Sequence, residues 1–155
     1  MSYIFDWHSL HYMLEYLPRS VLPRAWENFE MHCREDIVVS DRESKTCLEN
    51  ELLDEQHSEW IKRNTRMFKP ISMEESVFLG EMMASREFDF LNTTEWVQRR
   101  SPEGIPFVIC IAKIQDRVYV YQKNTKFLEI IKKICEKYAI KYIEVEEYLL
   151  RINKS

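Results

Sequence analysis

The sequence predicts an α/β domain of three layers, in which helices cover both faces of a small central parallel sheet. Short, almost wholly apolar runs occur towards both ends of the chain, as strands of a buried parallel sheet require. The middle of the chain instead carries apolar residues at helical spacing. A chain of 155 residues can bury one hydrophobic core without disulfides or a structural metal. We therefore expect a single domain over residues 1–155.

The N-terminal part predicts a strand, two helices and a second strand. Residues 3–5 form an apolar run that ends at Asp6, and leucines and a methionine at helical spacing follow it up to Pro18. A second helix is expected over 23–34, because its apolar residues share one face and proline suits a first helical turn. Residues 37–39 are then typical of a buried strand.

The rest of the chain predicts a mostly helical middle over 41–103, followed by a strand over 117–121, a helix over 127–138 and a strand over 142–145. A strand, a helix and a strand in this order indicate a parallel pair with a right-handed crossover. The segment 105–112 (IPFVICIA) is almost wholly apolar and rich in β-branched residues, so local propensity alone favours a strand there.

Composition excludes several classes of site and of cellular location. Only Gly80 and Gly104 are glycines, so neither a Walker loop nor a G-x-G-x-x-G turn is present. The four cysteines have no paired C-x-x-C spacing, which excludes a zinc knuckle and a C-x-x-C redox motif. No apolar run is long enough to cross a bilayer. We expect a cytoplasmic protein with reduced, mostly buried thiols and no membrane contact.

Positive charge gathers in the C-terminal part of the chain. Residues 113–155 hold 10 Lys and Arg against 6 Asp and Glu, whereas residues 1–112 hold 12 against 20. The expected helix over 127–138 and its approach carry the candidate RNA-binding residues Lys126, Lys132, Lys133 and Lys137. These lysines are more typical of the solvated face of an amphipathic helix.

Asp6 and Asp41 both follow predicted strands. Ligands of an open parallel sheet gather at the carboxyl ends of its strands, and two carboxylates there are the usual beginning of a Mg²⁺ site. The other interpretation is that each aspartate caps the helix that follows it. The sequence leaves both open.

Four segments carry a resemblance to a known family. They are YIFDWHSL, LPRSVLPRAWENFE with Trp60 downstream, IVVSDRES and GIPFVICIAK, and in this order and spacing they cover nearly the whole chain. The chain resembles the PIN-domain family, in particular a PIN-like branch associated with toxin–antitoxin pairs. The resemblance implies a parallel-sheet fold, a helix at 105–113, and descent from Mg²⁺-dependent endoribonucleases with three or four metal-binding acids. It also implies a homodimer, an antitoxin or another protein as partner.

The acids that the family pattern requires are mostly replaced. The first acid falls on Asp6, and the hydroxyl residue that follows it falls on Ser9. The second acid falls on Cys47 and the third on Ile105, while residues 122–124 supply no fourth acid. Because catalysis with bound metal needs several carboxylates to hold the ions, we expect a degenerate centre with no cofactor. Binding of RNA or of a protein would then be its role, with Asp6 at most a weak metal ligand.

The alternative is an active endoribonuclease that uses Mg²⁺ or Mn²⁺ and displaced carboxylates. Glu43 and Glu51 lie one helical turn before and after Cys47, and Glu103 precedes Ile105 by two residues. A third possibility is a protein that contacts only other proteins.

Overall fold

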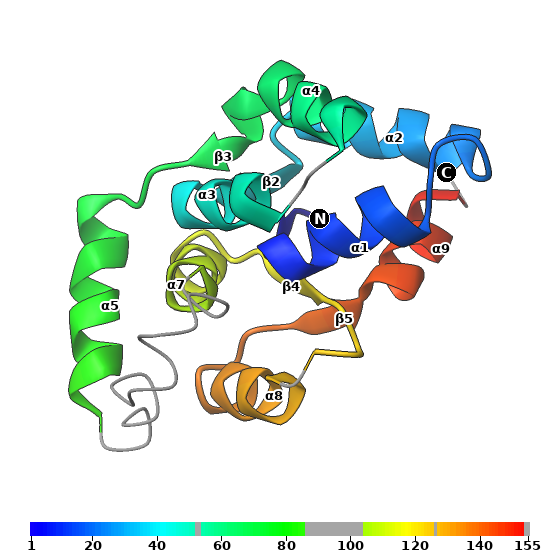
Figure 1. The fold of residues 1–155 in the computed structure, drawn as a ribbon. Coiled ribbons are helices and arrows are strands. Elements are labelled where there is room, and N and C mark those ends of the chain that lie inside the picture. Colours follow the sequence, from blue (N-terminus) through cyan, green and yellow to red (C-terminus); the bar gives the residue numbers. More distant parts are fainter. Residues whose placement is uncertain (52–53, 86–103, 126, 154–155) are drawn as a thin grey trace.

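A computed structural model describes residues 1–51, 54–85, 104–125 and 127–153 of the chain. Its five strands are all parallel and lie in the order β3-β2-β1-β4-β5 (Figure 1). The strands are β1 (Tyr3–Phe5), β2 (Val38–Asp41), β3 (Phe68–Lys69), β4 (Val118–Tyr121) and β5 (Tyr142–Glu144). The α/β fold with a central parallel sheet is therefore as predicted.

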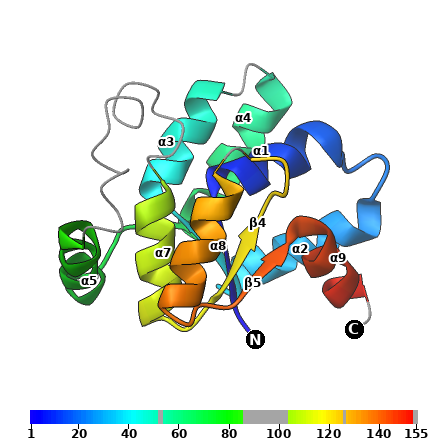
Figure 2. The same cartoon turned by 90° about the horizontal axis from the view of Figure 1, so that it is seen from below.

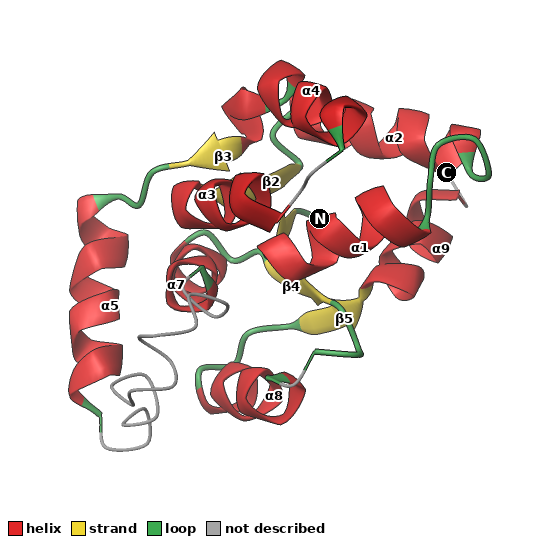
Figure 3. Ribbon diagram, viewed as in Figure 1, coloured by secondary structure: helices red, strands yellow, loops and turns green. Residues whose placement is uncertain are grey.

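Helices connect the strands and cover the sheet (Figure 3). They are α1 (Trp7–Tyr16), α2 (Pro23–Arg34), α3 (Arg42–Glu51), α4 (Glu55–Arg63), the short 3₁₀ helix η1 (Thr65–Met67), α5 (Met73–Ala84), α7 (Ile105–Ile114), α8 (Leu128–Lys137) and α9 (Val145–Asn153). Among the described residues, no helix is long and apolar enough to cross a membrane.

The sheet separates two hydrophobic cores because successive residues of a strand point to opposite faces. Tyr3 and Phe5 belong to one core with apolar residues of α1, α2, α4 and α9. Ile4, between them, belongs to the other core with residues of α5, α7 and α8. Figures 1 and 2 show these two groups of helices on opposite sides of the strands. This arrangement gives the three predicted layers.

Two tryptophans anchor the first core. Trp26 and Trp60 expose only 3% and 4% of their surfaces. Their rings pack edge to face with centroids 5.8 Å apart, and Phe29 stacks on Trp60 at 6.0 Å. Such contacts add to the stabilisation that burial alone provides. All four cysteines are free and buried, as expected.

The apolar segment that begins at Ile105 is a helix, as the resemblance implies and against its β propensity. Seven of the ten residues of α7 are buried, on nearly all sides. A helix with such surroundings needs no polar face, so tertiary burial overrides the preference of the β-branched residues for strands.

Several elements differ from the expectation, and one of them is β2, which covers Val38–Asp41 instead of 37–39 and so includes Asp41. The middle of the chain contains a strand, β3, whose residues pair with Ser40 and Asp41 of β2. Two residues are too few to show an alternating pattern, so the sequence does not reveal it. The last strand ends at Glu144 instead of Val145, because Val145 begins α9 and packs in the first core.

Candidate functional site

The candidate site lies where β1 and β2 end. Ile4 of β1 pairs with Val39 of β2, so the same register brings Asp6 beside Asp41 two residues further on. The exposed fractions of the two aspartates are 0% and 1%. We call Asp6, Asp41, Ser44 and Tyr119 the buried acid site, since all four are buried at this edge of the sheet.

Asp6 is fully engaged by the protein. Its Oδ1 caps α1 by accepting a hydrogen bond of 2.8 Å from the Ser9 amide. Its Oδ2 accepts a hydrogen bond of 2.6 Å from the Tyr119 hydroxyl. Burial, followed by the negative charge of Asp6, raises the pKa of Tyr119 well above its usual value. Tyr119 therefore keeps its proton and holds one oxygen of Asp6 through a neutral donor.

Asp41 is only half satisfied. Its Oδ2 accepts hydrogen bonds from the amides of Glu43 (2.9 Å) and Ser44 (3.3 Å), which form the first turn of α3. Its Oδ1 is buried and has no hydrogen-bond partner among the described residues. Burial raises the pKa of Asp41 to about 7, although the hydrogen bonds from Ser44 and Glu43 oppose the shift. Asp41 is therefore the titratable group of the site near neutral pH.

Helix α7 closes the site against Ser44. A Cβ added to Gly104, the residue before α7, would lie 2.5 Å from the Ser44 Oγ, so only glycine permits this approach without a shift. The Ser44 Oγ is buried near the Asp41 carboxylate, and its side chain helps to oppose the rise in the pKa of Asp41. Ile105, the first residue of α7, is 1% exposed and belongs to the second core. An apolar side chain thus begins the helix where the family pattern has an acid.

The remaining residues of the family pattern are placed as follows. Ser9 is buried, and its hydroxyl donates to the Val120 carbonyl at 2.9 Å. Cys47 is buried on α3 in the first core. Glu43 and Glu51 are exposed on the same helix, and Glu43 contacts Asp41 through its amide. Glu103 lies outside the described residues.

Sequence reasoning considered Asp41 with Asp6, either as a Mg²⁺ ligand or as a helix cap, but it left Ser44 and Tyr119 out of the candidate residues. Tyr119 alternates with Val118 and Val120 in β4, which predicts its face of the sheet but not its partner. Ser44 has no sequence signal, because only the close approach of Gly104 distinguishes it from other helical serines.

The described residues contain no group of three or more His, Cys, Asp or Glu side chains that could hold a metal ion. Asp6 and Asp41 are the acids that could contribute to one, and three of their four carboxylate oxygens already accept hydrogen bonds. Mg²⁺ retains several waters when it binds proteins, which two carboxylates with such low exposure do not accommodate. Asp6 connects the first turn of α1 to Tyr119 of β4, and Asp41 caps α3.

Comparison with known proteins finds no family model, no curated protein and no solved structure that matches the chain. The fold and the site define a three-layer α/β protein with a buried pair of aspartates at the carboxyl edge of its parallel sheet.

Divalent metal is expected to leave the thermal stability unchanged. A ligand that binds only the native protein adds about 2.7 kcal/mol at a hundred times its dissociation constant. For a domain of this size that gain corresponds to roughly 5–10 °C in Tm. We expect millimolar Mg²⁺ or Mn²⁺ to change Tm by less than about 1 °C relative to a potassium salt of equal ionic strength. A larger rise that disappears in Asp6→Asn would show that Asp6 binds metal and would contradict the expectation.

Proposed function

We propose that this protein is a PIN-like domain of the toxin–antitoxin type with a degenerate nuclease centre, and that it acts by binding RNA. The observation that best supports degeneracy is the burial of Asp6 and Asp41, which use their oxygens to hold the protein together. An ion and a scissile phosphate both need an open site at these carboxylates. A protein partner, either an antitoxin or a second copy of the chain, belongs to this proposal through the resemblance alone.

A basic groove next to the buried acid site supports RNA as the ligand. This cavity of about 470 Å³ lies between α3, η1 and β3 and contains the charged side chains of Arg42, Lys45, Arg66 and Lys69. No carboxylate is among its lining residues. Arg42 directly follows Asp41, so the groove borders the edge of the sheet where ligands of parallel-sheet proteins gather. Clustered cations of this kind bind phosphates.

Two of the four cations are already paired. Lys69 contacts Asp36 at 2.8 Å, and Lys45 contacts Glu49 one turn further along α3. Arg66 is near enough to Asp36 to help lower the pKa of that carboxyl, for which the hydrogen bond from Lys69 is the main cause. Within the described residues, neither Arg42 nor Arg66 takes part in an ion pair within 4 Å. The two arginines are therefore the best candidates for phosphate contacts.

The lysines predicted to bind RNA lie elsewhere in the fold. Lys132 is half-buried and Lys133 and Lys137 are exposed on α8, which connects β4 to β5. β3, which lines the basic groove, is at the opposite edge of the sheet from β5. Lys137 also contacts Ser85 at 3.3 Å and the ring of Tyr138. Lys126 lies outside the described residues. The prediction for these lysines stays open and separable from the groove.

Arg42→Gln with Arg66→Gln is expected to weaken RNA binding at least tenfold. Each arginine that contacts a phosphate releases about one counterion, so the slope of log affinity against log salt should become less steep by roughly one to two. Fluorescence anisotropy of a labelled single-stranded RNA over a range of potassium chloride concentrations measures both effects. Arg24→Gln with Arg34→Gln removes the same charge from exposed positions of α2 and is the matched control. Equal losses in both double variants would contradict a specific role for the groove, and no binding by the unmodified chain would contradict the RNA proposal.

A second candidate is an active Mg²⁺-dependent endoribonuclease. It is favoured by one observation: Asp41 adds an acid beside Asp6, and its Oδ1 has no hydrogen-bond partner among the described residues. An assay with Mg²⁺ or Mn²⁺ on structured and single-stranded RNA distinguishes the two candidates. Cleavage that is lost in both Asp6→Asn and Asp41→Asn, but not in Asp54→Asn, would favour the enzyme.

A further inference from the structure

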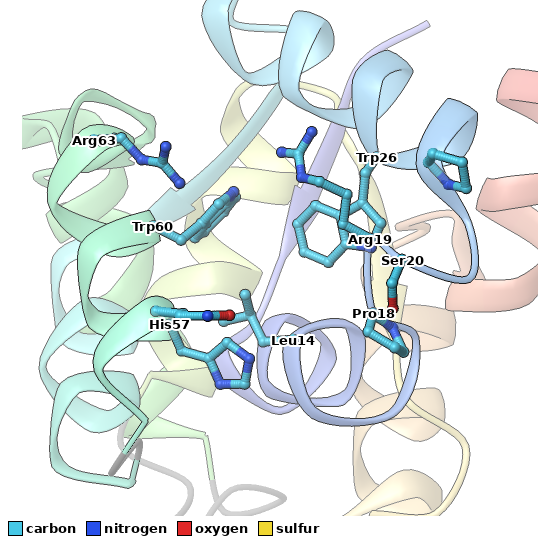
Figure 4. A pocket seen from close by; sticks show the side chains of 10 residues that line it. Leu14, Pro18, Arg19, Ser20, Trp26, His57, Trp60 and Arg63 are labelled. Carbon is cyan, nitrogen blue, oxygen red and sulfur yellow. The ribbon is translucent and has the colours of Figure 1, made fainter.

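A second cavity, of about 570 Å³, lies between α1, α2 and α4 and shares no residue with the buried acid site or the basic groove (Figure 4). Its apolar wall includes Leu14, Pro18, Trp26 and Trp60, and its charged groups include Arg19 and Arg63. Cavities of this volume hold small organic molecules, usually against apolar walls with a few polar groups that fix the orientation.

One buried donor in this wall has no acceptor. The indole nitrogen of Trp60 is buried without a hydrogen-bond partner in the described part of the chain, although the residue is only 4% exposed. Trp26, next to it, donates its indole N–H to the Leu17 carbonyl at 2.6 Å. In the view of Figure 4, the Trp60 nitrogen is directed between the guanidinium groups of Arg63 and Arg19. A buried N–H without a partner is costly, so an acceptor from a ligand would be favourable here.

The charge at the cavity is positive. Arg19, half of whose side chain is exposed, pairs with Glu30 and lies over the ring of Trp26. His57 pairs with Glu15 at 3.2 Å. Arg63 makes no ion pair within the described residues, and Glu59, one turn earlier on α4, pairs with Lys62 at 3.6 Å. Arg63 therefore brings a planar cation that is not engaged in an ion pair, within the described residues, to the side of the cavity that Trp60 borders, although Glu55 and Glu59 line a neighbouring hollow with it.

We propose that this cavity binds a small aromatic anion, with its ring against Trp26 and Trp60 and its carboxylate or phosphate oxygens on Arg63 and the Trp60 N–H. The apolar wall provides the burial of the ring, and the two donors provide the recognition of the oxyanion. A carboxylate and a phosphate share this chemistry, since both accept two parallel hydrogen bonds from a guanidinium. The inference goes beyond the proposed function, because it concerns other residues and a small molecule.

The test uses benzoate and phenyl phosphate as probes, benzamide as the neutral counterpart of benzoate, and inorganic phosphate as an anion without a ring. Binding is followed on the full chain by calorimetry and by the assigned indole N–H resonance of Trp60 in ¹⁵N-labelled protein. We expect at least one aromatic anion to bind and to shift this resonance downfield, as a new hydrogen bond requires. The preferred anion identifies the oxyanion as carboxylate or phosphate. Benzamide and inorganic phosphate should each bind at least about tenfold more weakly than that anion.

Arg63→Met should weaken binding of the preferred anion at least about tenfold, and Arg63→Lys should recover part of the loss because it keeps the charge without the planar fork. Arg34→Met, which removes an exposed arginine at the end of α2, is the matched control and should bind normally. Circular dichroism verifies that the variants are folded. The inference is overturned if neither aromatic anion shifts the Trp60 resonance, if benzamide binds as well as benzoate, or if Arg34→Met and Arg63→Met have equal effects. RNA binding through the basic groove would survive each of these results.

Discussion

Asp41→Asn is expected to make the protein more stable than the unmodified chain at alkaline pH. This gain in stability should decrease as the pH falls. Burial raises the pKa of Asp41 to about 7 in the folded protein, against about 3.9 in an unfolded chain. Between these two values the folded state binds more protons than the unfolded state, so the free energy of unfolding decreases as the pH rises. Burial of the neutral carboxyl costs no stability through ionisation at low pH, and the penalty grows from about pH 4 until it is fully present above about pH 7.

The expected size of this effect follows from the shift. Between about pH 5 and about pH 8, Asp41 should remove about 2–3 kcal/mol from the free energy of unfolding. Asparagine keeps an oxygen that accepts from the amides of Glu43 and Ser44, and it carries no charge to bury. The stability of Asp41→Asn relative to the unmodified chain should therefore rise by that amount between the two pH values. Urea unfolding at both pH values measures the difference directly.

The control for this effect is Asp54→Asn. Asp54 also caps a helix, since its side chain accepts from the Gln56 amide at 2.7 Å, but it is exposed to solvent. Its replacement should leave the pH dependence of stability unchanged. Parallel pH profiles for Asp41→Asn and the unmodified chain would show that Asp41 is not held neutral by burial near pH 7, and that solvent or an ion reaches its free oxygen.

Asp6→Ala is expected to destabilise the fold by about 2–5 kcal/mol, because it removes a helix cap and also leaves a buried hydroxyl without an acceptor. The Ser9 amide would lose its acceptor, and the hydroxyl of Tyr119, which is 0% exposed, would lose its own. Urea or thermal unfolding monitored by circular dichroism measures the loss. Asp54→Ala removes an exposed cap alone and should cost only about 1 kcal/mol.

Tyr119→Phe in the Asp6→Ala background separates the two contributions. The double variant lacks the hydroxyl that Asp6→Ala leaves without an acceptor. Its loss of stability should therefore be smaller than the sum of the losses in the two single variants, with a coupling energy of roughly 0.5–3 kcal/mol. Additive effects would mean that the bond from Tyr119 to Asp6 contributes nothing to stability. A loss in Asp6→Ala no larger than in Asp54→Ala would contradict the assignment of Asp6 to a structural connection.

These two predictions bear on why a buried acid pair occurs in this fold. Asp41 lowers the stability at neutral pH through its burial, whereas Asp6 raises it through its hydrogen bonds. A buried titratable group of this kind often marks a functional site, although structural networks also produce it. The nuclease assay on Asp6→Asn and Asp41→Asn decides between these two interpretations, because a structural network predicts no metal-dependent cleavage.

The sequence by itself determined the order of most elements. The helix over 23–34 has a periodic pattern long enough to identify, and the short runs at 3–5 and 117–121 contain the strands β1 and β4. The burial of Trp26 and Trp60 follows from the same patterns, since large aromatic residues on the apolar face of a helix pack into the core. Local patterns of this kind predict the fold correctly because they indicate which face of a helix or strand is buried away from water.

The tertiary structure decided what local patterns cannot express. It made a helix of the segment from Ile105, since burial on nearly all sides outweighs β propensity, and it paired the two residues of β3 with β2. It joined Asp6 to Tyr119, 113 positions apart in the chain, and pressed Gly104 against Ser44. It also left the Trp60 indole without an acceptor beside Arg63. Each of these features depends on distances between segments that are far apart in the sequence. The register of the sheet and the packing of the helices set these distances, whereas the spacing of residues along the chain does not.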